Sequence, residues 1–256
     1  MPEYIDFISR IKLKLGIDLN LYKETQMRRR ITTLRNKRGY PDFSSYFTAL
    51  TTEETLLQEF LDRLTINVTE FYRNPKRWDI LQKRILPLLT KQNKQMTIWS
   101  AACSTGEEPY SLAIMMKENF PNIACRIIAT DLDENVLKKA KQGTYQAQAL
   151  RELPPTIKKK YFAEQQGMYK IKDTLKEMIR FKQHNLLADA YPSDVDLIVC
   201  RNVLIYFTDD AKAIIYHRMG KALRQSGVLF VGSTEQIFSP TNYNLDLIET
   251  FFYQKV

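Results

Sequence analysis

Short apolar segments alternate with helix-like stretches from residue 97 to the end of the chain, and this alternation constrains the fold more than any other feature. The segment VDLIVC is an almost continuous apolar run, as expected of a strand that is covered on both faces. Strands separated by helices favour an α/β fold with a mostly parallel sheet and helices on both sides. The segments that we expect to form its strands are 97–103, 125–131, 179–185, 195–200, 227–233 and 249–256.

Glycines indicate where two helices of this region end. One helix is expected to stop at Gly143, and a helix over 211–225 is expected to end at Gly227, because glycine adopts the left-handed backbone conformation of a helix C-terminus easily. After Gly143 the alternation breaks, and we predict an insertion over about 144–178 that carries a small antiparallel β hairpin. From composition alone, a surface excursion with no task is an equally good interpretation.

The N-terminal region follows a helical pattern throughout. Ile5, Ile8 and Ile11 recur at the spacing of one helix face, and three more short apolar stripes follow them. We therefore expect an all-α domain over residues 1–65 and a sheet-containing domain over residues 66–256.

Composition excludes several classes of protein. The chain of 256 residues is 44% hydrophobic, lacks an apolar run of membrane-spanning length, and begins without the pattern of a secretory signal. Cys103, Cys125 and Cys200 lie in apolar, strand-like settings, which favours reduced thiols and a cytoplasmic location. The only histidines in the sequence are His184 and His217, which are widely separated, so no metal site is expected. The net charge of +9 indicates an acidic partner, either nucleic acid or an anionic protein surface.

The turn after the first expected strand carries small residues and then an acid. Ala102, Ser104 and Gly106 let a ligand approach the backbone closely, and Glu107 follows them. A pyrophosphate would be repelled by Glu107, whereas a ligand with an ammonium group would be attracted. An acid in the first turn of a helix also suits the helix dipole, so this motif does not decide alone.

The ends of the next strands carry residues that suit an adenosine. Asp131 follows the second strand, where a carboxylate accepts hydrogen bonds from ribose hydroxyls, although Asp131 or Asp133 can also cap the next helix. The candidates for the adenine and for the reacting end of the ligand are Asn185, Leu186, Arg201 and Asn202. Together the four strand ends suggest an adenosine with an amino-acid-like tail, and S-adenosylmethionine fits that description. The segment 67–74, NVTEFYRN, mixes polar and apolar residues, and we expect it to fold over the ligand.

Five motifs together resemble one known family. NVTEFYRN, WSAACSTGEEPYSLAI, ATDLD, HNLL and CRNVLIYF, in this order and spacing, are similar to those of the chemotaxis receptor methyltransferases, the CheR-type protein-glutamate O-methyltransferases. The resemblance covers essentially the whole chain. It implies a Rossmann-like methyltransferase domain with an antiparallel last strand, S-adenosylmethionine as the methyl donor, S-adenosylhomocysteine as the product, and chemoreceptor glutamates as the substrate.

The resemblance also implies functional residues. The cofactor contacts that it implies are Asn67, Thr69, Arg73, Glu107, Asp131, Asn185, Leu186, Arg201 and Asn202, and we add Ala102 as a small residue of the turn after the first expected strand. Whether Glu107 or Glu108 contacts the methionine end is open by one position. Tyr206 would lie near the transferred methyl. From the chemistry, either Arg201 or Tyr206 could hold the incoming carboxylate, and we favour a hydrogen bond from Tyr206. The resemblance implies that the insertion can contact the receptor. In some members of the family this contact is made through a tail peptide of the receptor. We expect a monomer.

The chemistry of such a transfer agrees with the residues present. A glutamate side chain has an ordinary pKa of about 4.3, so the nucleophile is already ionised at neutral pH. No general base is required, and the catalyst has to align the reactants and remove water.

One helix of the N-terminal region is strongly basic. Between Leu21 and Tyr40 the only acid is Glu24, and a charged face that scarcely mixes signs is unusual for a merely solvated helix. The residues that we predict to bind an acidic receptor helix are Arg28, Arg30, Arg35, Lys37 and Arg38.

Two other functions share part of this pattern. A methyltransferase acting on RNA or DNA would have the same fold, cofactor and basic charge, but the sequence RNVLIY differs from the Asn/Asp-Pro-Pro-aromatic motif of base methylation. We therefore expect no nucleic-acid partner. A non-catalytic cofactor-binding scaffold is disfavoured because every expected contact position is intact.

Overall fold

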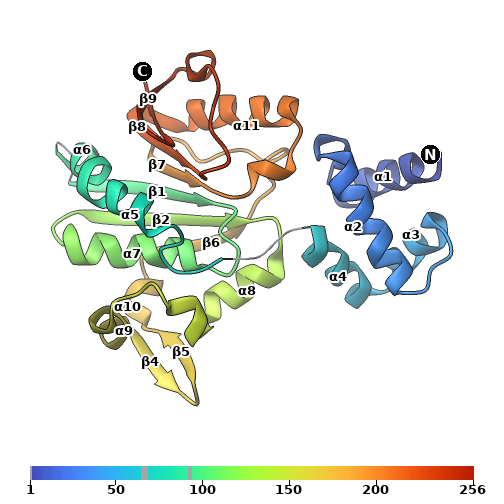
Figure 1. Cartoon of the computed structure of the whole chain (residues 1–256), viewed down its shortest axis with the longest axis horizontal. Helices are drawn as coiled ribbons and strands as arrows, with labels where there is room; N and C mark the ends of the chain where they lie inside the picture. The colour runs from blue at the N-terminus through green and yellow to red at the C-terminus, as the bar shows by residue number, and fades with distance from the viewer. Residues whose placement is uncertain (1, 65–68, 92–93) are drawn as a thin grey trace. The chain divides into compact units, whose positions relative to one another are not determined.

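The computed structural model describes residues 2–64, 69–91 and 94–256 of the chain. They form two compact units (Figure 1). One unit contains the N-terminal region up to residue 67 together with residues 203–215, and the other contains residues 68–202 and 216–256.

The first unit is built from short helices around an aromatic core. Phe7, Tyr46 and Phe60 are fully or almost fully buried, with their ring centroids between 6.0 and 6.3 Å apart. Such aromatic contacts add to the free energy that burial alone provides. Gly39 follows the basic helix with φ of +78°, the conformation of a glycine helix end. The elements are α1 (Pro2–Leu15), η1 (Leu19–Leu21), α2 (Glu24–Lys37), α3 (Phe43–Thr52) and α4 (Glu54–Leu64).

A segment from late in the sequence belongs to this first unit. The turn η4 (Leu204–Tyr206) is held by backbone hydrogen bonds from Lys23 N to Tyr206 O at 2.9 Å and from Thr208 N to Leu21 O at 3.0 Å. The ring of Phe207 packs 4.7 Å from that of Tyr22. The linear boundary at residues 65 and 66 does not include this segment, because periodicity along the chain carries no information on such long-range pairing.

The second unit contains a seven-stranded sheet with the order β6-β2-β1-β7-β8-β10-β9. The five strands β6, β2, β1, β7 and β8 are parallel, and β10 is antiparallel to β8, which confirms the mostly parallel sheet with an antiparallel end. The strands are β1 (Gln95–Ala101), β2 (Ala124–Asp131), β6 (Ile179–Gln183), β7 (Val195–Cys200), β8 (Leu223–Val231), β9 (Leu245–Glu249) and β10 (Phe252–Lys255).

Helices cover both sides of this sheet, with α7 and α8 on one side and α11 on the other (Figure 1). Every residue of β7 is buried, as its almost continuous apolar sequence predicted. The helices and turns of this part of the chain are α5 (Pro75–Ile80), the π-helical turn η2 (Leu81–Ile85), α6 (Leu86–Thr90), α7 (Glu107–Asn119), α8 (Glu134–Gln142), α11 (Asp209–Ala222) and η5 (Pro240–Tyr243).

The insertion after Gly143 forms its own small sheet beside the main one (Figure 1). Its three antiparallel strands have the order β3-β5-β4, which confirms the predicted antiparallel insertion. The sheet has one strand more than the predicted hairpin. Its elements are β3 (Thr144–Gln146), η3 (Ala147–Leu150), α9 (Pro155–Tyr161), β4 (Phe162–Gln165), β5 (Met168–Ile171) and α10 (Asp173–Lys176).

Two expectations about the C-terminal region were wrong. Helix α11 ends at Ala222, and Gly227 lies inside β8 and ends no helix. A Cβ at Gly227 would lie 2.9 Å from Val195 O, so close strand approach explains this glycine. Strand β9 was missed because it is an edge strand whose side chains are mostly exposed.

Within the described ranges, no helix combines the length and apolar character that crossing a membrane requires.

Candidate active site

The four strand ends that carry the predicted ligand contacts are neighbours in space. Strands β6, β2, β1 and β7 are consecutive in the sheet, and all four run parallel. Their carboxyl ends therefore meet at one edge of the sheet. From β1 the chain order departs in both directions, and ligands of open α/β sheets bind at such a switch point.

The turn between β1 and α7 is hydrogen-bonded to the end of β2. Cys103 N donates to Thr130 O at 2.8 Å, and Ser104 N donates to the Asp131 carboxylate at 2.8 Å. Gly106 has φ of +96°, and a Cβ there would lie 3.0 Å from the Cβ of Ala140. Both the backbone conformation and the close approach of α8 therefore require glycine at this position.

Asp131 is the centre of this turn. It is 5% exposed, and its second oxygen accepts the backbone N–H of Asp133 at 3.0 Å. Burial raises the pKa of Asp131, and the hydrogen bonds from Asp133 and Ser104 oppose the rise. Asp133, in contrast, caps α8 by accepting from Asn135 N at 2.8 Å. Of the two acids, Asp133 has the capping role, so Asp131 is left for the turn and a ligand.

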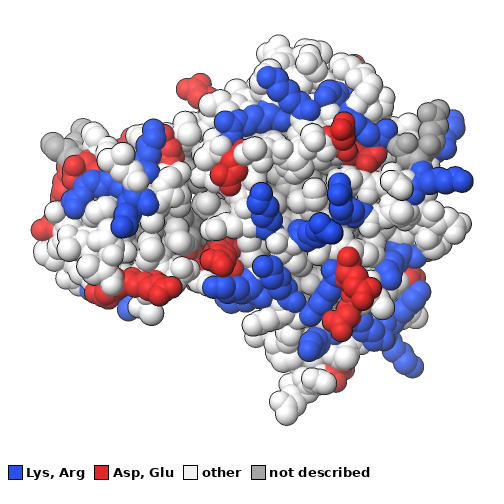
Figure 2. All heavy atoms as spheres, turned by 180° about the vertical axis from the view of Figure 1, so that it is seen from behind, with Lys and Arg blue, Asp and Glu red and all other residues white. Residues whose placement is uncertain are grey.

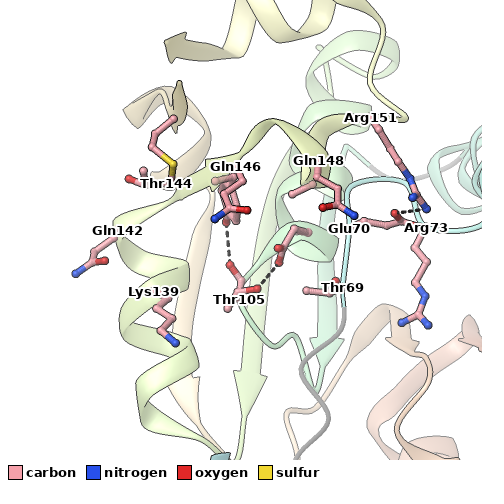
Figure 3. Close-up of a pocket in the computed structure, with 14 residues that line it drawn as sticks. Thr69, Glu70, Arg73, Thr105, Lys139, Gln142, Thr144, Gln146, Gln148 and Arg151 are labelled. Carbon is pink, nitrogen blue, oxygen red and sulfur yellow. Dashed lines mark hydrogen bonds and ion pairs between the residues drawn. The ribbon is translucent and has the colours of Figure 1, made fainter. Parts of the chain in front are cut away.

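A cavity of about 800 Å³ opens beside this turn (Figure 3). Three of the predicted cofactor contacts, Thr69, Arg73 and Glu107, line it. The other lining residues are Glu70, Thr105, Lys139, Gln142, Thr144, Tyr145, Gln146, Gln148, Ala149, Arg151 and Met168. The cavity thus joins the turn after β1, the segment after residue 68 and the base of the insertion.

Glu107 and Glu108 face different surroundings. Glu107 lines the cavity, where its carboxylate accepts a 2.7 Å hydrogen bond from the Thr105 hydroxyl. Burial raises the pKa of Glu107 to about 6. Glu108 accepts from the Ser100 hydroxyl at 2.8 Å, and its other oxygen lies 3.8 Å from the Arg201 guanidinium. Of these two adjacent acids, Glu107 is therefore the one available to a ligand in this cavity.

Arg201 is buried in the sheet unit. Its guanidinium donates to Arg73 O at 2.9 Å and lies over the rings of Phe230 and Trp78 at 4.8 and 5.7 Å. Its side chain is 3% exposed. In this arrangement Arg201 fixes the backbone of the segment that carries Arg73.

The remaining predicted contacts lie at the same sheet edge, outside the lining of the cavity. Ala102 and Asn202 follow β1 and β7 with φ of +61° each. The side-chain oxygen of Asn185 accepts from Leu187 N at 2.9 Å, and Leu186 is 7% exposed. Asn67 lies outside the described residues.

The segment that carries Thr69 and Arg73 is anchored on the insertion. Phe71 is fully buried, with its ring 5.0 Å from Tyr145 and 5.3 Å from Phe162, and its N–H donates to Ala149 O at 3.1 Å. The insertion is therefore part of the cavity wall, and the interpretation as a surface excursion with no task does not hold.

Replacing Phe71 by alanine is expected to lower the free energy of unfolding by about 3–5 kcal/mol, because a large buried ring leaves a cavity. Urea denaturation followed by tryptophan fluorescence measures this change, since Trp78 and Trp99 both lie in the second unit. Phe238→Ala is the matched control, as Phe238 is 82% exposed. Equal losses in the two variants would contradict the anchoring role.

A second cavity, of about 530 Å³, belongs to the first unit. Its lining contains four cations and, among the described residues, no acid: Gln26, Arg29, Arg30, Thr33, Leu34, Lys37, Arg63 and Tyr206. Arg30 donates to Leu64 O at 2.8 Å and lies 5.5 Å from the centroid of the Tyr206 ring. Tyr206 is thus held beside the basic face of α2.

The other cations of α2 have different neighbours. Arg28 lies 5.3 Å over the Tyr4 ring, Arg35 lies 4.6 Å over the Phe43 ring, and Arg38 makes a 2.6 Å ion pair with Glu59. Of the five predicted substrate-binding residues, only Arg30 and Lys37 line the cavity. The sequence prediction did not include Arg29 and Arg63, because helical phase alone cannot show which face α4 leaves open.

Sequence reasoning also missed residues of the sheet unit. The Thr105 hydroxyl donates to Glu107, and the Tyr145 hydroxyl donates to Thr105 O at 2.9 Å. Glu235, in the loop after β8, accepts from Asn202 N at 2.7 Å. The acid two residues after the expected strand 227–233 was the available signal, because the ends of neighbouring strands carry polar groups as well.

Comparison with known proteins agrees with this geometry. Residues 67–250 match the family model of the CheR methyltransferase, SAM binding domain, and residues 2–65 match that of the CheR methyltransferase, all-alpha domain. A chemotaxis protein methyltransferase of Listeria innocua is 45% identical, over 99% of this chain and 97% of its own. One of Borreliella burgdorferi is 35% identical, over 94% of this chain and 89% of its own.

The fold and the residues at its ligand-binding edge define an S-adenosylmethionine-dependent methyltransferase. The chain belongs to the CheR methyltransferase family. The chemistry of the donor set fits this cofactor: a buried carboxylate, Glu107, for an ammonium, the cation Arg73 for a carboxylate, and Asp131 for hydroxyl groups.

Proposed function

We propose that this protein transfers the methyl group of S-adenosylmethionine to glutamate side chains on the cytoplasmic helices of chemoreceptors, forming glutamate methyl esters. Relatives that cover nearly the whole chain are named chemotaxis protein methyltransferases. The observation that carries the substrate assignment is the cavity of the first unit, which contains four cations. Such a lining fits a carboxylate-rich partner helix. The protein would act in the cytoplasm as a monomer.

The residues that would hold the cofactor divide by chemistry. Glu107 would bind its ammonium group, Arg73 its carboxylate, and Asp131 its ribose hydroxyls. The side-chain amide of Asn202 and the segment with Asn185 and Leu186 would contact the adenosine. When bound, the cofactor supplies a methyl group on a positively charged sulfur. Asn67, Thr69, Ala102 and Arg201 complete the proposed set, with Arg201 acting through the backbone of Arg73.

The protein's own contribution to the reaction is orientation. A substrate glutamate with an ordinary pKa of about 4.3 is ionised at neutral pH, so no side chain has to accept its proton. Tyr206 would position the carboxylate by donating a hydrogen bond. Holding the two reactants in line can supply roughly 7–11 kcal/mol of the barrier. Removing water from both charges favours the less charged transition state.

The first unit would recognise the substrate, with residues 1–65 as its main part. The proposed contacts are Arg29, Arg30, Lys37, Arg63 and Tyr206, which line one cavity. Figure 2 shows Lys and Arg spread over the displayed face, consistent with the net charge of +9. This excess would raise the encounter rate with an acidic receptor. The insertion would offer a further receptor contact.

Cofactor affinity is expected to fall below about pH 6. The raised pKa of Glu107, about 6, means that its carboxyl is protonated and neutral at lower pH and no longer attracts an ammonium group. The dissociation constant should therefore be constant above about pH 7 and rise towards tenfold per pH unit in acid. Calorimetry across this range measures it. In Glu107→Gln, binding should be weak and should depend much less on pH; an unchanged profile would contradict the role of Glu107.

Incubation with radiolabelled S-adenosylmethionine tests the function. Receptor membranes and RNA are supplied separately as substrates. We expect base-labile label on the receptor protein, as a methyl ester gives, and none on RNA. Label on RNA would support the nucleic-acid alternative, and cofactor binding without label on either substrate would support a non-catalytic scaffold.

A further inference from the structure

A buried carboxylate in the loop after β8 holds the backbone of the loop after β7. Glu235 is 4% exposed, and its Oε2 accepts the N–H groups of Asn202 at 2.7 Å and of Gly232 at 2.8 Å. The β7–β8 ladder ends at the pair Cys200–Val231, just before these two residues. One carboxylate oxygen thus pairs two backbone donors beyond the end of the ladder.

The surroundings of Glu235 are built around this contact. A Cβ at position 232 would lie 2.3 Å from Glu235 Oε2 and 2.9 Å from Asn202 N, so only glycine leaves room for the carboxylate. Glu235 N donates to Gly232 O at 3.0 Å, and the Tyr216 hydroxyl donates to Glu235 O at 3.4 Å. The backbone of Glu235 is therefore fixed as well as its side chain.

The residue that Glu235 holds is in an uncommon conformation. Asn202 has φ of +61°, in the left-handed region that non-glycine residues seldom occupy. Asparagine enters this region more readily than other side chains, because it can hydrogen-bond locally, and the contacts around Asn202 select it here. A short hydrogen bond to a carboxylate supplies this constraint, since charge-assisted bonds are about twice as strong as neutral ones.

The two residues after β7 each lie beside an acid from another part of the sheet unit, one in helix α7 and one in the loop after β8. Arg201 lies beside Glu108 of α7, and the backbone of Asn202 is bonded to Glu235. We propose that Glu235 is a positioning residue for the cofactor: it sets the backbone conformation of Asn202 and so presents the Asn202 side chain to the adenosyl group. This inference rests on the proposed function, in which Asn202 contacts the cofactor.

Two substitutions of Glu235 separate this role from a general one. Glu235→Ala leaves two N–H groups without an acceptor and should raise the dissociation constant for S-adenosylmethionine at least about tenfold. Glu235→Gln retains an oxygen at the same place and should stay within about threefold of the wild type. Glu177→Ala, which removes an exposed acid of the same unit, is the control and should change nothing.

Calorimetry gives the affinities, and circular dichroism melting gives the stabilities. Equal affinity in the Glu235→Ala and Glu235→Gln variants, with only the melting temperature lowered, would overturn the proposal. If the alanine variant does not fold, Glu235→Asp replaces it. Its carboxylate is one methylene shorter and no longer reaches the two N–H groups, so this variant should bind the cofactor about fivefold more weakly than the glutamine variant. Equal affinities of these two variants would also overturn it.

A double-mutant cycle with Asn202→Ala tests whether Glu235 acts through Asn202. Once the Asn202 side chain is removed, Glu235→Ala should weaken binding by less than about twofold more, since interacting residues are not additive. Additive losses would overturn the proposal. If Asn202→Ala weakens binding and Glu235→Ala does not, only the role of Glu235 fails. If Asn202→Ala has no effect, the assignment of Asn202 in the proposed function fails with it.

Discussion

Asp131→Asn should weaken S-adenosylmethionine binding at least about a hundredfold. The two oxygens of Asp131 accept different backbone donors, Ser104 N at 2.8 Å and Asp133 N at 3.0 Å. An amide has one oxygen, so one of these N–H groups would face the NH₂ group. The turn after β1 would lose a charge-assisted bond worth about 1.5–3 kcal/mol, together with the proposed contact to the ribose. Calorimetry at neutral pH measures the loss.

Asp133→Asn is the matched control for this prediction. Asp133 is 1% exposed and lies two residues further along, but its carboxylate caps α8. Asparagine caps a helix about as well as aspartate, so cofactor affinity should stay within about threefold. Melting curves of both variants report whether they fold. Wild-type affinity in Asp131→Asn, or the same loss in both variants, would show that Asp131 has no special place in the ligand site.

Reversing two charges in the cavity of the first unit should raise the KM for receptor at least about tenfold, because like charges would then face an acidic partner. The variant is Arg29→Glu with Lys37→Glu, and both positions are exposed and line that cavity. Methylation of receptor membranes at several receptor concentrations measures KM. The increase should shrink as salt is added, and the cofactor dissociation constant should not change.

A pair of substitutions on the same helix provides the control. Arg28→Glu with Arg35→Glu changes the net charge by the same amount, but these side chains lie over Tyr4 and Phe43. Their KM should rise less than about threefold. Equal increases in the two double variants would mean that only net charge attracts the substrate. A parallel loss of cofactor affinity would mean that α2 supports the fold instead.

Much of the architecture was predictable from local pattern. The period of the apolar residues identified the helices of the first unit and six of the seven strands of the sheet, and the break after Gly143 identified the insertion. The prediction failed where exposure or long-range contact decides the outcome. Edge strand β9 has few buried side chains, and Gly227 is required by the nearby Val195 O, a residue far away in sequence.

The candidate site was predictable as a set of strand ends, since parallel strands place their carboxyl ends at one edge. The direction of each side chain was not. Glu107 and Glu108 are adjacent in sequence, yet one lines the cavity and the other lies beside Arg201. The helical period places the two side chains in different directions. Only the packing of Glu108 against Ser100 and Arg201 determines that Glu107 is the one that lines the cavity.

The sequence by itself determined the fold class, the family and the motifs at the sheet edge, because each depends on residues that are close along the chain. The tertiary structure alone decided that Phe71 is anchored on the insertion, that Tyr206 lies beside the basic face of α2, and that Glu235 bonds the backbone of Asn202. Each of these contacts joins residues far apart in sequence, and their pairing follows from how the elements pack.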